Sequence, residues 1–303
     1  MTAGRGRVPR LFACLLLLLL TACIPLQYDL RLVKIGLVAP LSGAARAEGQ
    51  RWVFAARDAG REWNQAEGSG RYRVELIAYD EADGPAVARR LVVDSEVLGV
   101  VGYLRTDHGV ATTFQEAGMP FATLAPAGPT LRQQEAPAVR LVTRQDALDR
   151  LAAMSGLPPH AWENVPRTLS EIASWWPAPL RVFAEPDPGR ALWLSSARGV
   201  PDTPEGRRFA AEYQERWRTP PSPLSVAAYD GVHAMLRGMA GALDGPEEQR
   251  RAAIGASLTQ PYSGVAGDYR WDGSGEIAVP RAYLLDVSDG LPGRLVREVS
   301  SPR

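Results

Sequence analysis

Two pairs of small polar residues stand directly ahead of predicted helices. Ser42-Gly43 precedes a predicted helix at about residues 50–67, and Thr106-Asp107 precedes one that carries Val110 and Phe114. The first backbone N–H groups of a helix are free to donate, and the helix dipole makes that end positive. These residues therefore predict a site for an anion, such as a small carboxylate. The alternative is that Ser42, Thr106 and Asp107 only cap their helices.

Residues that could carry out catalysis are sparse. The sequence has no HExxH, GxSxG or phosphate-binding-loop motif, and its two cysteines are Cys14 and Cys23. His108 directly follows Thr106 and Asp107, but adjacent side chains at a helix start diverge, whereas triad partners normally come from distant parts of a chain. We therefore expect that the protein is not an enzyme and that it uses no cofactor and no metal.

The predicted anion site requires parallel strands, because their carboxyl ends meet at one edge of a sheet. Short apolar runs typical of strands buried on both faces are VKIGLVAP (33–40), VELIAYD (74–80), VLGVVGYL (97–104) and PFATLAP (120–126). Helical patterns lie between them, the clearest being Trp52, Ala56 and Ala59 on one face. This alternation predicts an α/β fold with right-handed crossovers. The loops at 39–50, 80–85, 103–109 and 125–131 then line one cleft.

The second half of the chain continues with two helices and a hairpin. A helix begins at Thr203-Pro204-Glu205, with Phe209, Tyr213 and Trp217 four residues apart on its inner face. The next helix carries an apolar stripe from Ala228 to Met239. Residues 268–287 are interpreted as two strands around the turn 272–275, and a calcium-binding loop is the alternative for this acidic turn.

The N-terminus has the pattern of a lipoprotein signal. Arg5, Arg7 and Arg10 precede a leucine run that ends in Leu20-Thr21-Ala22-Cys23, as in the bacterial lipobox. The apolar run from 11 to 20 is half the roughly 20 residues that a spanning helix needs. We expect cleavage after residue 22, lipidation of Cys23 and a tether at 23–32, with an ordinary secretory signal as the alternative.

Composition argues against a nucleic-acid partner. Without the leader, 31 basic side chains face 34 acidic ones, and Lys34 is the only lysine. A slightly acidic chain with no basic segment does not attract a phosphate backbone. We therefore expect contact with a membrane through the lipid anchor alone.

Six segments together resemble the leucine/isoleucine/valine-binding proteins of ATP-driven importers. They are VKIGLVAPLSG (33–43), EGQRWVFAARDA (48–59), YDEADGPAVARRLV (79–92), VVGYL (100–104), EAGMPFATLAPAGP (116–129) and AAYDGVHAMLRGM (227–239). Each is weak alone, but their order and spacing follow the family from 33 to 130, and more loosely from 203 to 289. The resemblance implies a type I periplasmic-binding fold, in which two α/β lobes, each with a parallel sheet flanked by helices, are joined by three crossings and close on a small ligand.

The resemblance also implies ligand-binding residues. Thr106 stands where the family places a hydroxyl beside the ligand carboxylate, and the Ala127-Gly128 backbone where it makes polar contacts. Thr130 is near another hydroxyl position, and Glu48 replaces a frequent aromatic ring and could meet a ligand ammonium group. With Ser42 at the first helix, these residues form the predicted site. Asp83 and Arg105 occupy the positions of a disulfide in many relatives, and we expect an ion pair there.

The second lobe is predicted to be reduced. From Arg140 to Ala191 there are only 52 residues, whereas one βαβ unit needs about 30. Trp175-Trp176 could form a substitute ligand wall or fill a thin core. The expected division is 1–22 signal peptide, 23–32 tether, 33–131 with 195–265 as lobe 1, and 132–194 with 266–303 as lobe 2.

Two functions fit these features. The first is a solute-binding lipoprotein for branched-chain or other amino acids or amide-like solutes, with an ABC permease as partner. The second is a regulatory lipoprotein, for example an activator of cell-wall synthases, in which protein contact replaces solute capture. Both predict an exported protein, lipid-anchored to a bacterial membrane on its periplasmic or outer face. Fold alone does not decide between them.

Overall fold

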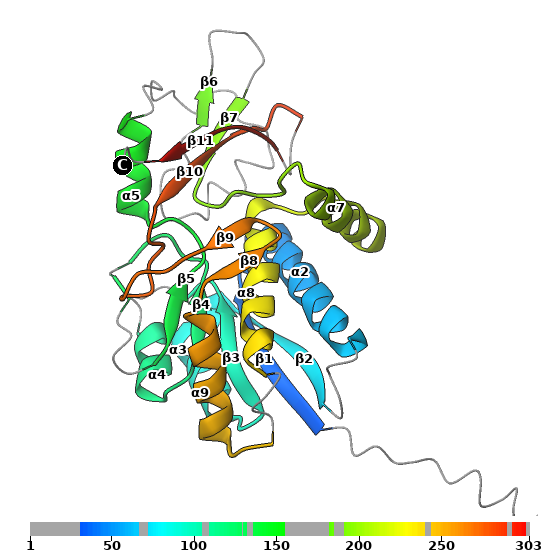
Figure 1. Cartoon of the computed structure of the whole chain (residues 1–303), viewed down its shortest axis with the longest axis vertical. Coiled ribbons are helices and arrows are strands. Elements are labelled where there is room, and N and C mark those ends of the chain that lie inside the picture. The colour runs from blue at the N-terminus through cyan, green and yellow to red at the C-terminus, as the bar shows by residue number, and fades with distance from the viewer. Residues whose placement is uncertain are drawn as a thin grey trace, which may run out of the picture.

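Two lobes, each built on one β-sheet, lie one above the other in the computed structural model (Figure 1). The chain passes between them at residues 141–144, 196–203 and 270–280, which we call the first, second and third crossings. The expected α/β fold class is confirmed, but the parallel sheet expected in each lobe is present only in the first, because the described strands of the second lobe pair antiparallel. The structure describes residues 31–66, 72–104, 109–128, 130–131, 136–154, 182–184, 191–239, 244–289 and 293–300.

The first lobe contains a five-stranded parallel sheet, sheet A. Its strands are β1 (Arg31–Ala39), β2 (Tyr72–Asp80), β3 (Val97–Gly102), β4 (Phe121–Thr123) and β5 (Ala138–Arg140), in the order β2-β1-β3-β4-β5. All residues of β3 are buried, as its continuous apolar run predicts for a strand covered on both faces. The four predicted strands are all present, and β5 is an additional one.

Helices cover both faces of sheet A. One face packs against α2 (Arg46–Gln65), α8 (Pro223–Met239) and α9 (Glu247–Leu258), and the other against α3 (Gly84–Val93) and α4 (Val110–Glu116). A short 3-10 turn, η2 (Glu81–Asp83), follows β2. The predicted stripe on α2 is confirmed, because Trp52, Ala56 and Ala59 are fully buried.

Helix α7 (Pro204–Trp217) begins where its sequence predicts. The Thr203 hydroxyl accepts a hydrogen bond from the Gly206 backbone N–H at 3.1 Å, and Pro204 occupies the first turn. The Trp217 ring stacks on Phe54 of α2 with 4.2 Å between ring centroids. Its indole N–H also donates to Asp58 at 3.0 Å, which fixes α7 to the outside of α2.

The second lobe contains a four-stranded antiparallel sheet, sheet B. Its strands are β6 (Val182–Ala184), β7 (Ala191–Ser195), β10 (Arg281–Asp286) and β11 (Arg294–Ser300), in the order β11-β10-β7-β6. Helix α5 (Gln145–Met154) packs on β10, and its Leu148 and Leu151 join a small core with Leu192 and Leu284. Among the described residues, this lobe therefore has one thin core.

Two boundaries differ from the sequence prediction. Strand β5 pairs with β4, so the first lobe extends to Arg140 rather than ending at residue 131. The turn 272–275 is present, but its flanks pair only through one bridge between Trp271 and Ile277. The hairpin before it is β8 (Tyr262–Gly264) with β9 (Gly267–Tyr269), which lies against α8 (Figure 1).

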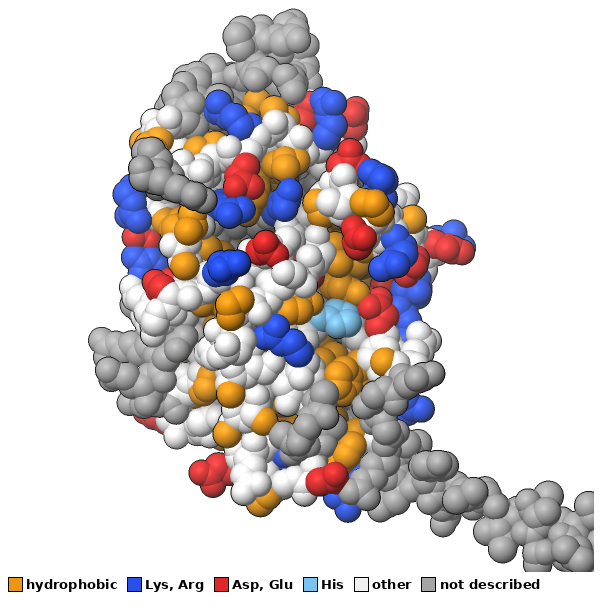
Figure 2. Space-filling view, viewed as in Figure 1, with side chains coloured by type: hydrophobic (Ala, Val, Ile, Leu, Met, Phe, Trp, Pro, Cys, Tyr) orange, Lys and Arg blue, Asp and Glu red, His pale blue; other side chains and the backbone are white. Residues whose placement is uncertain are grey.

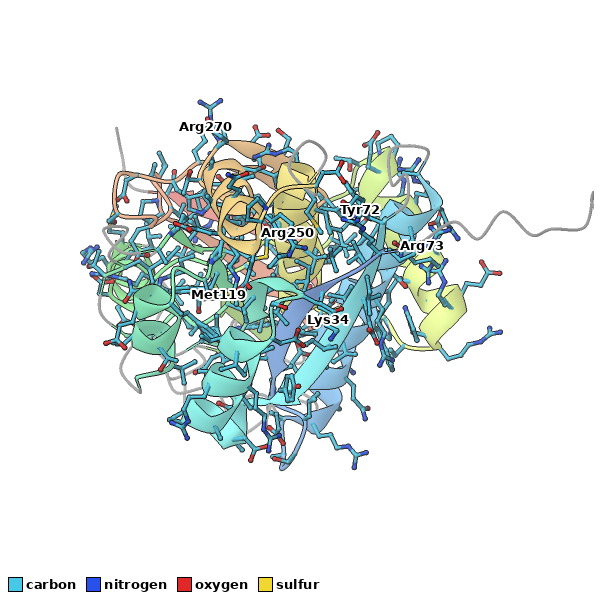
Figure 3. All side chains as sticks on the ribbon, turned by 90° about the horizontal axis from the view of Figure 1, so that it is seen from below. Lys34, Tyr72, Arg73, Met119, Arg250 and Arg270 are labelled. Atoms are coloured by element: carbon cyan, nitrogen blue, oxygen red, sulfur yellow. The ribbon has the colours of Figure 1, made fainter. Side chains whose placement is uncertain are left out.

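Lys34 lies on β1, and Figure 3 shows it in the view from below. Its ammonium group contacts a carboxylate oxygen of Asp94 at 2.9 Å and one of Glu96 at 2.7 Å. These hydrogen bonds raise the pKa of the lysine well above its usual range.

Within the part of the chain that the structure describes, no helix is both long and apolar enough to cross a bilayer.

Candidate functional site

The loops that follow β1, β2, β3 and β4 lie at one edge of sheet A, next to the second lobe. Ser42 is exposed in the first of these loops. Helix α2 begins at Arg46 with Ala45 as its N-cap, and no side chain caps it. Ser42 therefore does not cap the helix, and its hydroxyl lies at the surface of this edge.

Asp80 connects the first two loops of the edge. One of its carboxylate oxygens accepts hydrogen bonds from the backbone N–H groups of Leu41 and Ala82, each at 3.2 Å. Because β1 and β2 are paired up to Ala39 and Asp80, the two loops leave the sheet side by side. The carboxylate fixes their relative position and uses two backbone donors that are otherwise free.

Glu48 is directed into the protein and is 2% exposed. Its carboxylate accepts hydrogen bonds from Trp52 Nε1 at 2.9 Å, from Arg51 at 3.2 Å and from the Ser222 hydroxyl just before α8. Gly49 allows this close packing, since a Cβ there would lie 1.9 Å from the Pro40 carbonyl oxygen. In this structure Glu48 fastens α2 to α8, and its oxygens are occupied by protein donors.

The fourth loop, residues 124–131, contains three of the predicted site residues. It follows Thr123, the last residue of β4, whose buried hydroxyl donates to the Leu104 carbonyl and accepts from the Ala125 N–H, both at 3.0 Å. Gly128 has a φ of +103°, a conformation that side-chain-bearing residues rarely adopt. Thr130 is exposed, and its hydroxyl receives a hydrogen bond from Arg144 at the start of α5.

Arg140 is bonded to the backbone of this loop, and its role was not predicted from the sequence. Its side chain is fully buried and donates to Glu276 at 2.8 Å and 3.3 Å, and to the carbonyl groups of Ala125 and Ala127. Glu276 also accepts from the Leu131 N–H at 3.1 Å. The ion pair thus joins the loop to the third crossing. The signal in the sequence is an arginine in the apolar run AVRLV, where a charge requires a partner.

Comparisons with known proteins agree with this architecture. Residues 32–148 match the family model described as periplasmic binding protein. A solute-binding protein of an ABC transporter from R. palustris, solved with benzoate, has a TM-score of 0.65 at 15% identity, covering 90% of this chain and 98% of that chain. The chain has the type I periplasmic-binding fold. No curated protein matches the sequence.

Two amino-acid-binding proteins share this binding-protein fold with the chain. The branched-chain amino acid transporter substrate-binding protein from Streptococcus pneumoniae, solved with isoleucine, gives a TM-score of 0.58 at 15% identity, covering 89% of this chain and 99% of that chain. A leucine-binding protein from Thermotoga maritima gives 0.60 at 15% identity, covering 88% and 98%. The predicted resemblance to the leucine/isoleucine/valine-binding proteins is confirmed at the level of the fold.

Several predicted residues of the binding-protein fold lie outside the described residues. They are Cys23, Arg105, Thr106, Asp107, His108, Trp175 and Trp176. Asp83 is described at the end of η2, but its expected partner is not. The structure therefore brings Ser42, Ala127, Gly128 and Thr130 to the edge of sheet A, and moves Glu48 into the packing beneath it.

A polar cavity of about 300 Å³ adjoins Thr130 between the lobes. On its second-lobe side, the Arg144 guanidinium group forms two hydrogen bonds with Asp146, at 2.5 Å and 2.6 Å. This pairing holds the pKa of the Asp146 carboxyl far below its usual range. Asp272 and Glu276 of the third crossing line the opposite side. The cavity therefore lies between the loop at the edge of sheet A that contains Thr130 and the start of α5 in the second lobe.

Proposed function

We propose that the protein is an exported solute-binding lipoprotein of an ABC-type importer. The observation that carries the proposal is the free edge of sheet A, where Ser42, Gly128 and Thr130 face outward in a fold shared with solute-binding proteins. Periplasmic-binding relatives of this fold support capture of a small molecule, with a permease as the implied partner.

The ligand class we favour is a small carboxylate, such as a branched-chain or other amino acid, an amide-like solute of similar size, or an aromatic acid. Isoleucine and benzoate, the ligands of two structural relatives, share a carboxylate group. Backbone N–H and hydroxyl donors at the edge suit that group. We assign Thr106, Ser42 and the Ala127-Gly128 backbone to the carboxylate, and Thr130 to a secondary contact; Glu48 is excluded from the ligand site because its buried carboxylate is bonded to protein donors.

A thermal-shift screen tests solute capture. Leucine, isoleucine, benzoate and 4-hydroxybenzoate are added separately, and a ligand at 100 times its Kd should stabilise the protein by about 2.7 kcal/mol. For any compound that stabilises the wild type, Thr106→Ala should weaken the binding free energy by about 1 kcal/mol or more. Thr259→Ala, at the end of α9, is the matched control and should bind like the wild type.

The thin second lobe favours one other function, that of a regulatory lipoprotein that contacts a protein such as a cell-wall synthase. If millimolar ligands leave the melting temperature unchanged while a synthase is retained on the immobilised protein, solute capture is wrong.

Lipidation of Cys23 is tested separately. Cys23→Ser should release the protein from membranes, because a single tethered anchor holds it there. Intact mass gives the direct measurement, and a chain that still contains residues 1–22 contradicts the proposal.

A further inference from the structure

A second cavity, of about 120 Å³, lies at the hinge between the lobes. Its walls include Leu141 of the first crossing, Ser196 and Arg198 of the second, and Arg281 and Tyr283 of β10. The β8–β9 hairpin and α8 also contribute to its lining, through residues 266–269 and Ala227. Any group bound here touches segments that connect the two lobes.

The hinge itself is fastened by Thr143, which is 1% exposed. Its N–H donates to the Ser196 carbonyl at 3.0 Å, its hydroxyl donates to the Arg281 carbonyl at 2.5 Å, and the same hydroxyl accepts from the Arg281 N–H at 3.2 Å. One residue therefore connects the first crossing with the second crossing and with β10. The cavity is formed where these segments separate again.

Positive charge predominates around the cavity. Its lining contains Arg198, Arg270 and Arg281, against the single carboxylate of Asp268. Asp268 already accepts a hydrogen bond from the Ser263 hydroxyl at 2.6 Å, and Figure 3 shows Arg270 projecting from the edge of the molecule. Figure 2, in the orientation of Figure 1, shows basic and acidic side chains around the middle of the molecule. The two arginines that remain for the cavity are Arg198 and Arg281.

Arg198 is incompletely bonded. Its Nη1 donates to the Ala266 carbonyl at 3.3 Å, but its buried Nε has no hydrogen-bond partner among the described residues. Buried polar groups normally have partners, and the cost of leaving one without is largest for charged groups. Gly267 makes room for this side chain: a Cβ there would lie 2.9 Å from Nη1, and its φ is +124°. The hairpin thus leaves space for a guanidinium group whose Nε has no acceptor among the described residues.

Tyr283 supplies a hydroxyl next to these cations. Burial and the nearby Glu298 raise the pKa of Tyr283, whereas Arg281 and Arg198 act in the opposite direction. Both guanidinium groups are therefore close enough to the phenol to influence its charge. Arg281 has Glu298 as a partner at 3.2 Å, on the solvent side of the lobe.

We propose that the hinge cavity binds a small oxyanion, a carboxylate or a phosphate, between Arg198 and Arg281. The missing acceptor at Arg198 requires an oxygen, and a planar guanidinium group matches the oxygens of either anion. The volume is ample, since one water needs roughly 10–15 Å³ by the same measure. The bound anion connects the second crossing to β10, so it favours the interlobe angle at which both arginines reach it.

Calorimetric titration of the purified protein with inorganic phosphate, and separately with acetate, tests this site. We expect at least one of the two to bind, and the stronger one identifies the source of the oxyanion. Arg198→Gln should weaken that binding at least tenfold. Arg294→Gln is the matched control, because its side chain is 79% exposed on the same lobe, and it should bind like the wild type.

Tyr283→Phe keeps the buried ring and gives a second variant in case Arg198→Gln folds poorly; it should weaken binding severalfold. Hydrogen exchange adds a structural readout, since the anion should slow exchange at both 196–198 and 281–283. The proposal is overturned if neither anion binds the wild type, if the variants bind as tightly as Arg294→Gln, or if exchange slows in only one of these segments.

Discussion

The two lobes differ in how their sheets are covered. Sheet A is parallel and has helices on both faces, with separate buried clusters on each side. Sheet B is antiparallel, and its described core consists of seven buried residues between α5, β7 and β10. Because stabilisation scales with the apolar area buried, the first lobe contributes most of the stabilisation that comes from the described core residues. The second lobe depends on its attachment at the hinge.

The largest expected effect comes from breaking that attachment at Arg140. Arg140→Ala leaves Glu276 without its main partner and frees the 124–131 loop, so it should cost about 3–5 kcal/mol of unfolding free energy. Chemical denaturation gives the value. Arg294→Ala is the control, because that side chain is 79% exposed and its surface pair with Asp286 is worth about 0–1 kcal/mol.

The combined variant Arg140→Met with Glu276→Leu separates charge from shape. Replacing both partners removes the unpaired charge, so it should be less destabilised than Arg140→Ala alone. Equal losses in the two variants would mean that the ion pair is not what holds the loop.

Truncating one buried leucine in each lobe allows a direct comparison of the two lobes. Leu37 of β1 and Leu284 of β10 are 0% and 3% exposed, and truncation to alanine costs about 2–5 kcal/mol at buried sites. Leu37→Ala should lower protection from hydrogen exchange throughout the protein. Leu284→Ala should speed exchange in β7, β10 and α5 while β1 and β3 remain protected. Val296→Ala on β11, 40% exposed, is the control and should have little effect.

If Leu284→Ala destabilises β1 and β3 as much as β10, the lobes unfold as one unit and the distinction drawn above is wrong.

Local patterns were sufficient to predict most of the first lobe. The continuous apolar runs became β1 to β4, and the Thr203 cap and the α7 stripe follow the sequence directly. Such features depend on neighbours within a few residues. Strand β5 was missed because it has three residues and is defined by pairing with Phe121–Thr123, not by its own pattern.

The site was less predictable because its contacts are long-range. Glu48 reaches Ser222, 174 residues away, and Arg140 reaches Glu276, 136 residues away. A single sequence without structure does not indicate which distant group satisfies a buried charge. The edge loops could be predicted from the strand ends, whereas the direction of Glu48 and the role of Arg140 could not.

Asp230 holds the β8–β9 hairpin on the first lobe, and its titration makes this contact testable. This fully buried carboxylate on α8 accepts hydrogen bonds from the Val265 and Ala266 N–H groups, at 2.7 and 2.9 Å, and from the Tyr269 hydroxyl at 3.0 Å. Burial raises its pKa from 3.8 to about 6. Between pH 3.8 and about 6, Asp230 is therefore protonated in the folded state and ionised in the unfolded state. Its contribution to the free energy of unfolding decreases as the pH rises through that window.

Asp230→Asn removes this titration. The variant should be destabilised relative to the wild type at pH 7, and more so at pH 4, with a difference of up to about 3 kcal/mol from the conversion of the pKa shift. Comparison of the two proteins at each pH cancels the titration of all other groups. An equal loss at pH 4 and pH 7 contradicts the raised pKa.

The smallest expected effect is at the cap of α7, which lies outside the sheet. Thr203→Ala removes the bond to the Gly206 N–H and should cost about 1 kcal/mol. Thr203→Ser keeps the hydroxyl and serves as the control. A loss above that of Leu37→Ala would mean that α7 contributes more to the first lobe than the sheet interior does.

Lys34 has a practical consequence for these experiments. As the only lysine, it offers amine-reactive dyes and crosslinkers a single side chain, and its ion pairs keep that amine protonated and 19% exposed. Acylating reagents need the neutral amine, so they should label it slowly and attach few probes to the surface. Fluorophores for following the angle between the lobes are better attached to introduced cysteines, because residues 24–303 contain no cysteine.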